Sequence, residues 1–198
     1  MLACVDVHYQ TAGAVAACVL FSSWGQSDSE AEFAQGVRQV APYEPGKFYR
    51  RELPCILSVL KIIQPVPSII VVDAYVWLSI EERFGLGAHL YEALERKCSI
   101  VGVAKSPFFE GPNVAKVTRN SSARPLFVTS AGIPLEDAIC AIQQMHGSFR
   151  IPTLIKRVDQ LAKKGKLPDG ASNISLPQDV QGFRTIQATC PSPKRKFF

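Results

Sequence analysis

The chain has 198 residues, of which 47% are hydrophobic and 20% charged, which is typical of a single globular domain with an ordinary core. Its net charge of +5 permits a polyanionic partner without requiring one, and its apolar stretches are too short and interrupted to span a membrane. The cysteines and histidines lack the spacing of a zinc site, and with no secretory signal evident we expect an intracellular, cytoplasmic protein with reduced thiols.

The first part of the chain predicts three strands and a helix. Residues 2–9 and 14–21 are apolar strands joined by the turn 10–13, and 33–40 supplies a third strand. A proline-containing turn then leads into an amphipathic segment from about Arg50 to Ile63. This order predicts an antiparallel meander followed by a helix.

Strands and helices alternate through the second part of the chain. The run Ile69–Asp73 is rich in β-branched residues, as in buried parallel strands. The remaining predicted elements are a helix at 83–97, a strand at 99–104, a strand within 125–129, and helices at 134–145 and 152–164. The whole pattern predicts an α/β fold with a ribonuclease H-like mixed central sheet flanked by helices.

The domain is predicted to span residues 1–164. From residue 165 the hydrophobic periodicity fades, and proline, glycine, serine and glutamine become frequent. Such a composition cannot bury enough apolar surface to offset the entropy of ordering the chain. Residues 165–198 are therefore predicted to be a flexible tail.

Acidic residues stand at positions where a carboxylate needs a partner. Asp6 lies inside an apolar segment, Asp73 ends an apolar run, Glu52 follows the proline-containing turn, and Asp159 belongs to the last predicted helix. A carboxylate at the end of a buried strand is costly unless it is paired, hydrogen-bonded or bound to metal. Several converging carboxylates favour a hard divalent cation, which prefers oxygen ligands.

Each acid also has a structural interpretation when it is considered alone. Asp6, Asp73 and Glu52 could accept hydrogen bonds at element ends, and Asp159 could be a solvated helix residue. Lys105 could equally be an ordinary surface lysine. The interpretation as a metal site therefore depends on the acids occurring together in one motif order.

Several segments, in order, resemble the endonuclease V family of metal-dependent nucleases that act on inosine-containing nucleic acid. The resemblance covers roughly residues 3–164, and the order and spacing of the pieces are more specific than any single one. The matching pieces are Val5-Asp6-Val7-His8-Tyr9, Pro42-Tyr43-Glu44-Pro45-Gly46, Arg51-Glu52-Leu53-Pro54, Val71-Val72-Asp73, Gly85-Leu86-Gly87-Ala88-His89-Leu90, Gly102-Val103-Ala104-Lys105-Ser106, Pro125-Leu126-Phe127-Val128-Thr129 and Arg150-Ile151-Pro152.

The resemblance implies a catalytic set of five residues. Asp6 and Asp73 match the principal metal-binding aspartates of the family, and Glu52 matches the acid that completes the metal site. Asp159 matches a metal-binding position that is histidine in many relatives, and Lys105 matches a lysine near the scissile phosphate. The implied metal is Mg²⁺, with Mn²⁺ as an alternative.

The resemblance also implies a nucleic-acid contact surface. The proline-containing turn matches a wedge that separates strands, although Tyr43 could instead pack within the turn. The expected contact residues lie in this turn and near the strand ends: Pro42, Tyr43, Pro45, Gly46, Ala74, Gly102 and Lys105.

Two departures from the family pattern concern specificity. After Asp73 the family usually has Gly-x-Gly, but this chain has Ala74-Tyr75-Val76. Glycine lets a backbone approach a ligand closely, so the two added side chains predict weaker discrimination for inosine. Tyr75 and Trp77 are expected to be buried. Glu44 stands in the turn where the family often has an apolar residue, which places an anion near the substrate phosphates.

These observations predict a magnesium-dependent endonuclease that cleaves phosphodiester bonds near inosine in DNA or RNA, leaving 3′-hydroxyl and 5′-phosphate ends. Two alternatives stay open. One is a nucleic-acid-binding protein of the same fold that has lost efficient cleavage, and the other is a nuclease with a different structure or base preference. The sequence does not distinguish DNA from RNA. It indicates no membrane partner and leaves the oligomeric state open.

Overall fold

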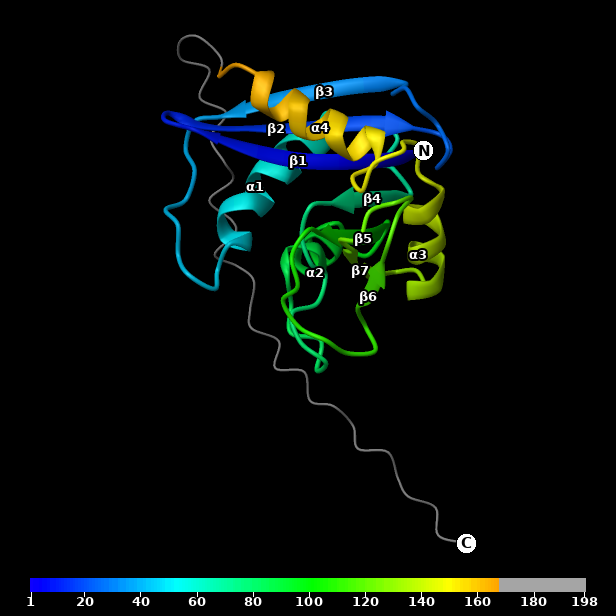
Figure 1. The fold of residues 1–198 in the computed structure, drawn as a ribbon. Helices are drawn as coiled ribbons and strands as arrows, with labels where there is room; N and C mark the ends of the chain where they lie inside the picture. The colour runs from blue at the N-terminus through cyan, green and yellow to red at the C-terminus, as the bar shows by residue number, and fades with distance from the viewer. Residues whose placement is uncertain (168–198) are drawn as a thin grey trace, which may run out of the picture.

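A seven-stranded mixed sheet with helices on both faces forms the protein (Figure 1). The computed structural model describes residues 1–167. The elements are β1 (Leu2–Gln10), β2 (Gly13–Phe21), β3 (Ala31–Val37), α1 (Tyr49–Leu60), β4 (Ile69–Val72), α2 (Leu86–Ala93), β5 (Ser99–Ala104), β6 (Ala115–Val117), β7 (Leu126–Ala131), α3 (Leu135–Gln144) and α4 (Thr153–Lys164).

The strand order across the sheet is β3-β2-β1-β4-β5-β7-β6. The chain enters as an antiparallel meander, β1 to β3, and then places β4 and β5 parallel to β1 at the centre. β7 and β6 complete the sheet in antiparallel pairs. The predicted mixed α/β sheet is confirmed.

The alternation of side chains along β1 divides the core into two layers. Val5 and Val7 belong to a cluster that includes residues of α1 and α2, whereas Leu2 and Cys4 belong to a cluster that includes residues of α3 and α4. Successive side chains of a strand point to opposite faces of the sheet. Asp6 shares its parity with Leu2 and Cys4, which places its side chain on the α4 face.

Helix α4 carries its apolar residues on one stripe. Leu154, Ile155, Val158 and Ala162 are buried against β1 and β2, at the spacing expected for one face of a helix. Burial of each larger aliphatic side chain contributes about 1.5–3 kcal/mol before the entropy cost. The stripe fixes the rotation of the helix, and Asp159 therefore lies at the border of the buried face.

The elements that differ most from the sequence prediction are β6 and α2. β6 was not predicted, because a three-residue edge strand containing an exposed lysine has no readable periodicity. α2 spans Leu86–Ala93 rather than 83–97, since the Leu78 N–H binds the Arg83 carbonyl in a turn before the helix. None of the helices in residues 1–167 combines the length and apolarity needed to cross a membrane.

The predicted tail falls mostly outside the described residues, which end at 167. Residue 165, just beyond the predicted domain boundary at 164, contacts the sheet. The Gln10 side-chain amide donates a 2.9 Å hydrogen bond to the Gly165 carbonyl. A Cβ on Gly165 would also lie 2.5 Å from Val15 Cγ1, so residue 165 packs against the hairpin.

Candidate functional site

Asp6 and Asp73 lie at the same level of two adjacent parallel strands, β1 and β4. Val5 of β1 pairs with Val72 of β4. Asp6 is the next residue within β1, and Asp73 directly follows the last residue of β4. A cavity of about 10 Å³ is lined by Asp6, Asp73 and Asp159. That is about the space of one water molecule, so three carboxylate-bearing residues surround a very small volume.

Glu52 approaches this group from α1. It is only 9% exposed and occupies the same buried stripe of the helix as Cys55 and Ile56. Burial raises the pKa of Glu52 to about 8, with further contributions from the charges of Asp6 and Asp73. The acid is therefore within electrostatic reach of both aspartates.

The carboxylate of Asp6 is also destabilised in its charged form. Burial raises its pKa to about 6, and the neighbouring charge of Asp73 adds to this effect. A backbone hydrogen bond from Val7 and the charge of Lys105 act in the opposite direction. The nearby positive charges therefore do not balance the negative charges of these acids.

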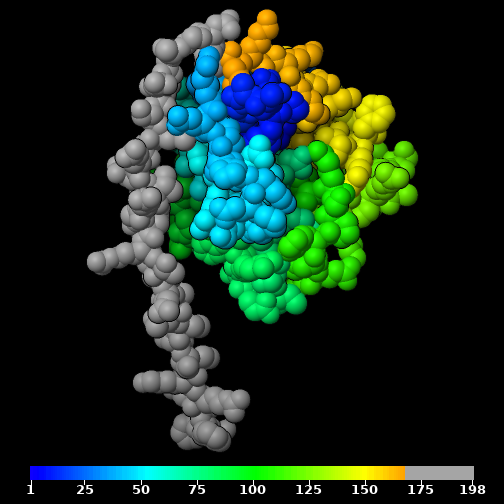
Figure 2. Space-filling view, turned by 90° about the vertical axis from the view of Figure 1, so that its left-hand side faces the viewer, coloured from blue at the N-terminus to red at the C-terminus, as the bar shows by residue number. Residues whose placement is uncertain are grey.

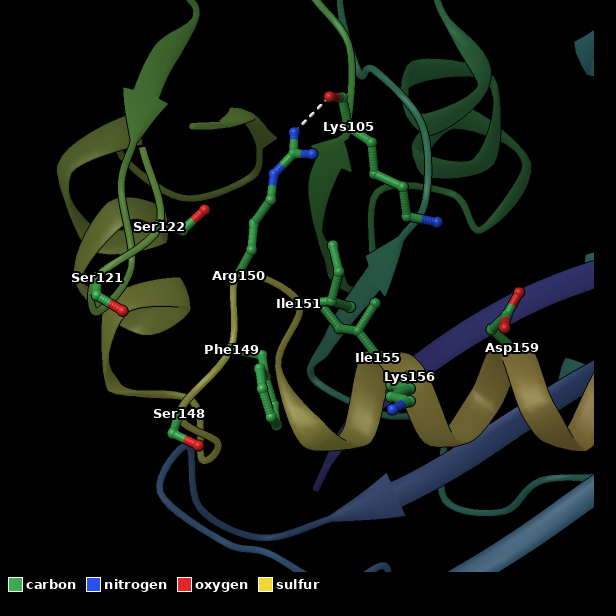
Figure 3. Close-up of a pocket in the computed structure, with 10 residues that line it drawn as sticks. All are labelled: Lys105, Ser121, Ser122, Ser148, Phe149, Arg150, Ile151, Ile155, Lys156 and Asp159. Atoms are coloured by element: carbon green, nitrogen blue, oxygen red, sulfur yellow. Dashed lines mark hydrogen bonds between the residues drawn. The ribbon is translucent and has the colours of Figure 1, made fainter. Parts of the chain in front are cut away.

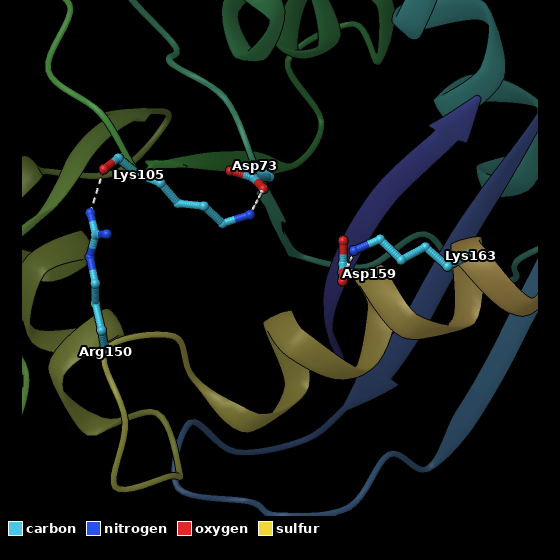
Figure 4. A network of polar contacts seen from close by, with 5 residues as sticks. All are labelled: Asp73, Lys105, Arg150, Asp159 and Lys163. Carbon is cyan, nitrogen blue, oxygen red and sulfur yellow. Dashed lines mark hydrogen bonds and ion pairs between the residues drawn. The ribbon is translucent and has the colours of Figure 1, made fainter. Parts of the chain in front are cut away.

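Lys105 supplies the cation that contacts Asp73. Its ammonium pairs with the Asp73 carboxylate, 32 residues earlier in the chain (Figure 4). Burial lowers the pKa of Lys105, but the hydrogen bond to Asp73 and the charges of Asp6 and Asp159 outweigh it and raise the pKa above its ordinary value. The lysine side chain is 45% exposed and lies beside Asp73 at the end of β4.

Arg150 holds the backbone of Lys105 in place. Its Nη2 donates to the Lys105 carbonyl (Figure 4). The same Nη2 also donates, at 2.6 Å, to the Pro125 carbonyl. One guanidinium therefore joins the segment after β5, the segment before β7 and the loop before α4. The backbone position of Lys105 depends on this bridge.

Asp159 lines the small cavity but already has a partner. Its carboxylate accepts a 2.7 Å hydrogen bond from Lys163, one turn further along α4 (Figure 4). The structure therefore places Asp159 beside Asp6 and Asp73. It also shows Asp159 paired with Lys163 on the surface of the helix, which agrees with the alternative interpretation of Asp159 as a solvated helix residue. Its role as a metal ligand stays a prediction.

The donor set fits a hard divalent cation, although the side chains are not arranged around one. Within the described part of the chain, no group of three or more His, Cys, Asp or Glu side chains is positioned to hold a metal ion. The acids offer only oxygen atoms, their charges repel one another, and two of them, Asp73 and Asp159, are each paired with a lysine. Oxygen donors with excess negative charge are what Mg²⁺ and Mn²⁺ bind.

The predicted wedge turn is exposed. Tyr43 is 62% exposed, and Pro42, Pro45 and Gly46 around it also face solvent. Gly46 has a φ of 77°, a conformation that other L-residues adopt only with strain. Tyr43 therefore does not pack within the turn, and its ring is available to a base.

Glu44 is not a free anion. Its carboxylate lies 2.8 Å from Lys47 Nζ and 3.5 Å from Arg50 Nη1. These exposed pairs contribute little to stability, but they offset the negative charge that Glu44 brings to the turn. The expected repulsion of substrate phosphates is correspondingly smaller.

The segment after Asp73 is anchored in the core. Val76 is fully buried, its N–H donates a 2.8 Å hydrogen bond to Thr129 Oγ1, and Trp77 Nε1 donates at 2.9 Å to the Ser130 carbonyl. The Tyr75 hydroxyl donates at 3.0 Å to the Ser106 carbonyl. The expected burial is confirmed for Tyr75, whereas Trp77 is only partly buried.

Gly102 has a packing role that the sequence did not reveal. A Cβ there would lie 2.5 Å from the Ala74 carbonyl oxygen and 2.6 Å from Thr129 Oγ1. The glycine is buried in β5 and lets the Ala74 backbone cross closely over the strand. Its predicted contact with nucleic acid is not tested by this geometry, and Ala74 itself is half-buried.

Sequence reasoning missed two residues beside Glu52. The Arg51 guanidinium lies 3.7 Å from the centroid of the Tyr9 ring, and the charge of Glu52 contributes, after burial, to a raised pKa of Tyr9. Tyr9 was visible only as part of a matching segment. No short-range signal links it to α1, because the contact spans more than forty residues.

Comparison with known proteins identifies one family. The model of the family described as Endonuclease V matches residues 1–131. The curated endonuclease V of Streptomyces avermitilis is 30% identical over 183 residues, which covers 81% of this chain and 78% of that protein.

Solved structures give the same family and the same fold. The crystal structure of endonuclease V from Streptomyces avermitilis superposes with a TM-score of 0.68 at 28% identity, covering 82% of this chain and 79% of that one. Endonuclease V of Ciona intestinalis, solved with a 24-nucleotide DNA containing an inosine followed by a ribo-adenosine, has a TM-score of 0.67 at 21% identity over 82% and 84%. The ribonuclease H-like α/β fold that was predicted is thereby confirmed.

Proposed function

The chain belongs to the endonuclease V family of divalent-metal-dependent nucleases, and from this premise we propose that it hydrolyses phosphodiester bonds near inosine in DNA or RNA. The proposed metal is Mg²⁺ or Mn²⁺, and the proposed product ends are a 3′-hydroxyl and a 5′-phosphate. Inosine is the base present in the DNA bound to the Ciona intestinalis relative. We carry that substrate over as part of the proposal.

One observation carries the proposal. Asp6 and Asp73 directly follow Val5 and Val72, which are paired on the adjacent parallel strands β1 and β4, and buried Glu52 is in electrostatic reach of both acids. Such a group of acids is costly to a folded protein. A divalent cation held by Asp6, Asp73 and Glu52, with Asp159 beside them, would offset that cost.

The protein residues have separate roles in the proposed reaction. When bound, the metal supplies Lewis-acid stabilisation of the phosphate and lowers the pKa of water. Lys105 provides a fixed positive charge beside the phosphate, held there by the bridge from Arg150 to its carbonyl. Exposed Tyr43 provides a surface on which a base can stack and by which the strand is held open.

The test is cleavage of matched oligonucleotides that differ at one base. Inosine-containing and guanosine-containing single and double strands, in DNA and RNA form, are incubated with Mg²⁺, with Mn²⁺ and with a chelator. The proposal predicts metal-dependent cleavage near inosine, with product ends identified by ligation and phosphatase treatment. Absence of cleavage on every inosine substrate with both metals would contradict it.

A second candidate function is binding without efficient cleavage. It is favoured by the pairing of Lys105 with Asp73, which leaves that carboxylate already neutralised. It is opposed by the retention of Asp6, Glu52 and Asp73 around one edge of the sheet. Tight binding of inosine-containing strands, with saturating Mn²⁺ and no product, would select this alternative.

A further inference from the structure

A large cavity adjoins the acids and has no role in the function proposed above. It has a volume of about 550 Å³ and lies between the loop 121–122, the loop 148–151 and the start of α4 (Figure 3). Lys105 and Asp159 line both this cavity and the candidate site. Volumes of this order are typical of sites for nucleotide-sized ligands.

The lining combines an exposed ring with positive charge. Phe149 is 74% exposed, the most exposed of the large hydrophobic side chains in the described residues. Three of the lining residues are basic, namely Lys105, Arg150 and Lys156, and one, Asp159, is acidic and paired with a lysine. An aromatic platform beside cations is the usual way to bind a single-stranded nucleic acid.

Some of the lining groups have no partner among residues 1–167. Lys156 forms no ion pair among residues 1–167, although Lys163 on the same helix does. The hydroxyls of Ser121 and Ser148 make no hydrogen bond within that part of the chain, whereas Ser122 is engaged with Arg124. One ammonium and two hydroxyls therefore remain available to a ligand with phosphate or sugar oxygens.

Arg150 has a different task from Lys156. Its Nη2 is committed to the carbonyls of Lys105 and Pro125. Arg150 therefore holds the backbone of Lys105, which lies between this cavity and the acids. Its Nη2 is not free to donate to a ligand, so this atom contributes only its positive charge to the cavity. Figure 3 shows Arg150 reaching toward Lys105, with Phe149 on the loop before α4 and Lys156 on the first turn of the helix.

The cavity and the Tyr43 turn lie on the two sides of the acid group. The turn leads into α1, which packs on one face of the sheet, whereas Phe149 and Lys156 belong to the region of α4, on the other face. Figure 2 shows the cyan turn and the yellow segment before α4 on the same face of the molecule. One strand could therefore contact the turn, the acids and the cavity in that order.

We propose that this cavity binds the nucleotide adjoining the scissile phosphate on the side away from the Tyr43 turn. The base of that nucleotide stacks on Phe149, and its phosphate lies beside Lys156 with the Ser148 hydroxyl. This inference rests on the proposed nuclease function, because it assumes that a strand crosses the acids. Under this proposal, the affinity of the protein for a strand depends on a nucleotide other than the inosine itself.

Binding of an abasic series tests the cavity. A single-stranded oligonucleotide with one inosine is synthesised with one abasic position, which is moved one nucleotide at a time along both sides of the scissile phosphate. Affinity is measured by fluorescence anisotropy without divalent cations, so that cleavage does not accompany binding. We expect one abasic position, on one side only, to lower the affinity of the unmodified protein by about 5- to 100-fold.

Phe149→Ala should weaken binding of the intact strand by a similar factor and should lose the response to that abasic position. Phe149→Tyr, which keeps an aromatic face, should retain both. The ring is 74% exposed, so neither change should alter the unfolding temperature. An abasic response that is the same in unmodified protein and Phe149→Ala would overturn the proposal, as would the absence of any response beyond the inosine.

Lys156→Ala tests the phosphate contact. It should reduce the slope of log affinity against log salt concentration by about 0.7, the value for one contact on a single strand. Lys61→Ala removes an exposed lysine at the far end of α1 and is the matched control, with no expected change. Equal slopes for the two variants would contradict the assigned contact.

The experiments distinguish failure of the proposed cavity from failure of the proposed nuclease function. Inosine-dependent cleavage without a Phe149-dependent abasic response would overturn the cavity and leave the nuclease function standing. A Phe149-dependent response without cleavage would support the cavity and contradict the nuclease function.

Discussion

Lys105 and Asp73 form an ion pair at the edge of the sheet, and this pair stands in the way of a metal ion. The Asp73 carboxylate that would bind a cation is already neutralised by the Lys105 ammonium. At the same time, Asp6 and Glu52 remain under-compensated, with pKa values raised by burial and by neighbouring acids. Metal binding and the position of Lys105 are therefore expected to be coupled.

Lys105→Ala should separate these two roles. Without the competing ammonium, Asp73 becomes more available, so half-saturation by Mn²⁺ should occur at a lower metal concentration. The cleavage rate at saturating metal should nevertheless fall by about 10²- to 10³-fold, since a preorganised charge at the reacting phosphate is lost. Metal titrations of the single-turnover rate measure both quantities. Unchanged metal binding together with an unchanged saturated rate would show that Lys105 is an ordinary surface lysine.

Asp6→Asn should abolish cleavage and spare the fold. The substitution conserves volume and removes one of several mutually repelling charges. The unfolding temperature without metal should therefore stay the same or rise, while the cleavage rate falls by at least about 100-fold. Thermal unfolding and single-turnover cleavage on the same preparations give both values. Full metal-dependent activity in Asp6→Asn would remove this residue from the site.

Metal should stabilise the unmodified protein through the same acids. A ligand that binds only the folded state raises its stability, so saturating Mn²⁺ should raise the unfolding temperature of the unmodified protein. The rise should be much smaller in Asp73→Asn. The matched control is Asp28→Asn, which removes an exposed acid distant from the strand ends and should leave the rise intact. An equal rise in the unfolding temperature of all three proteins would show that the metal binds at a site that does not include Asp73.

This protein should discriminate less strongly between inosine and guanosine than family members that have Gly-x-Gly after the second aspartate. Ala74 adds a side chain where that pattern has glycine, and the segment cannot shift easily because Val76 is bonded to Thr129. The measurement is the ratio of cleavage rates on inosine and guanosine substrates, which differ by one exocyclic amine. Ala74→Gly should raise this ratio, and a strong inosine preference in the unmodified protein would refute the crowding argument.

Glu44→Ile should tighten binding of nucleic acid. The change removes an acid and releases Lys47 and Arg50 from their pairs with it. Affinity should increase most at low salt, because the gain is electrostatic. A salt titration of oligonucleotide affinity provides the measurement, and an unchanged affinity at low salt would show that the turn does not approach the phosphates.

The sequence predicted the parts of the site that depend on local pattern. Asp6 and Asp73 could be placed together because each follows a short apolar run, and adjacent parallel strands bring such positions to the same level of the sheet. The amphipathic period likewise predicted α1, which carries Glu52, and α4, which carries Asp159. These features follow from residues that are close in the chain.

Contacts between distant segments could not be predicted in the same way. The pairing of Lys105 with Asp73, the bridge from Arg150 to Pro125, and the cavity beside Phe149 each join separate loops. Nothing in the local pattern sets those distances, because they depend on how the layers pack. The residues were visible in the sequence, but their relationships were not.

The domain boundary leads to a proposal about truncation. Gly165 is held by Gln10, so we propose that a chain ending at Leu167 folds and cleaves like the full protein. Such a truncation removes four basic and two acidic residues, and it should weaken nucleic-acid binding only at low salt. A lower unfolding temperature in the truncated chain would show that residues beyond 167 contribute to the folded domain.

A crystal grown with Mn²⁺ tests the central claim most directly. The claim is that Asp6 and Asp73, with Glu52, form the cation site of the nuclease. Anomalous difference density is predicted between the Asp6 and Asp73 carboxylates, with the Lys105 ammonium moved away from Asp73. Density at another position, or unchanged pairing of Lys105 with Asp73 at saturating Mn²⁺, would contradict the account.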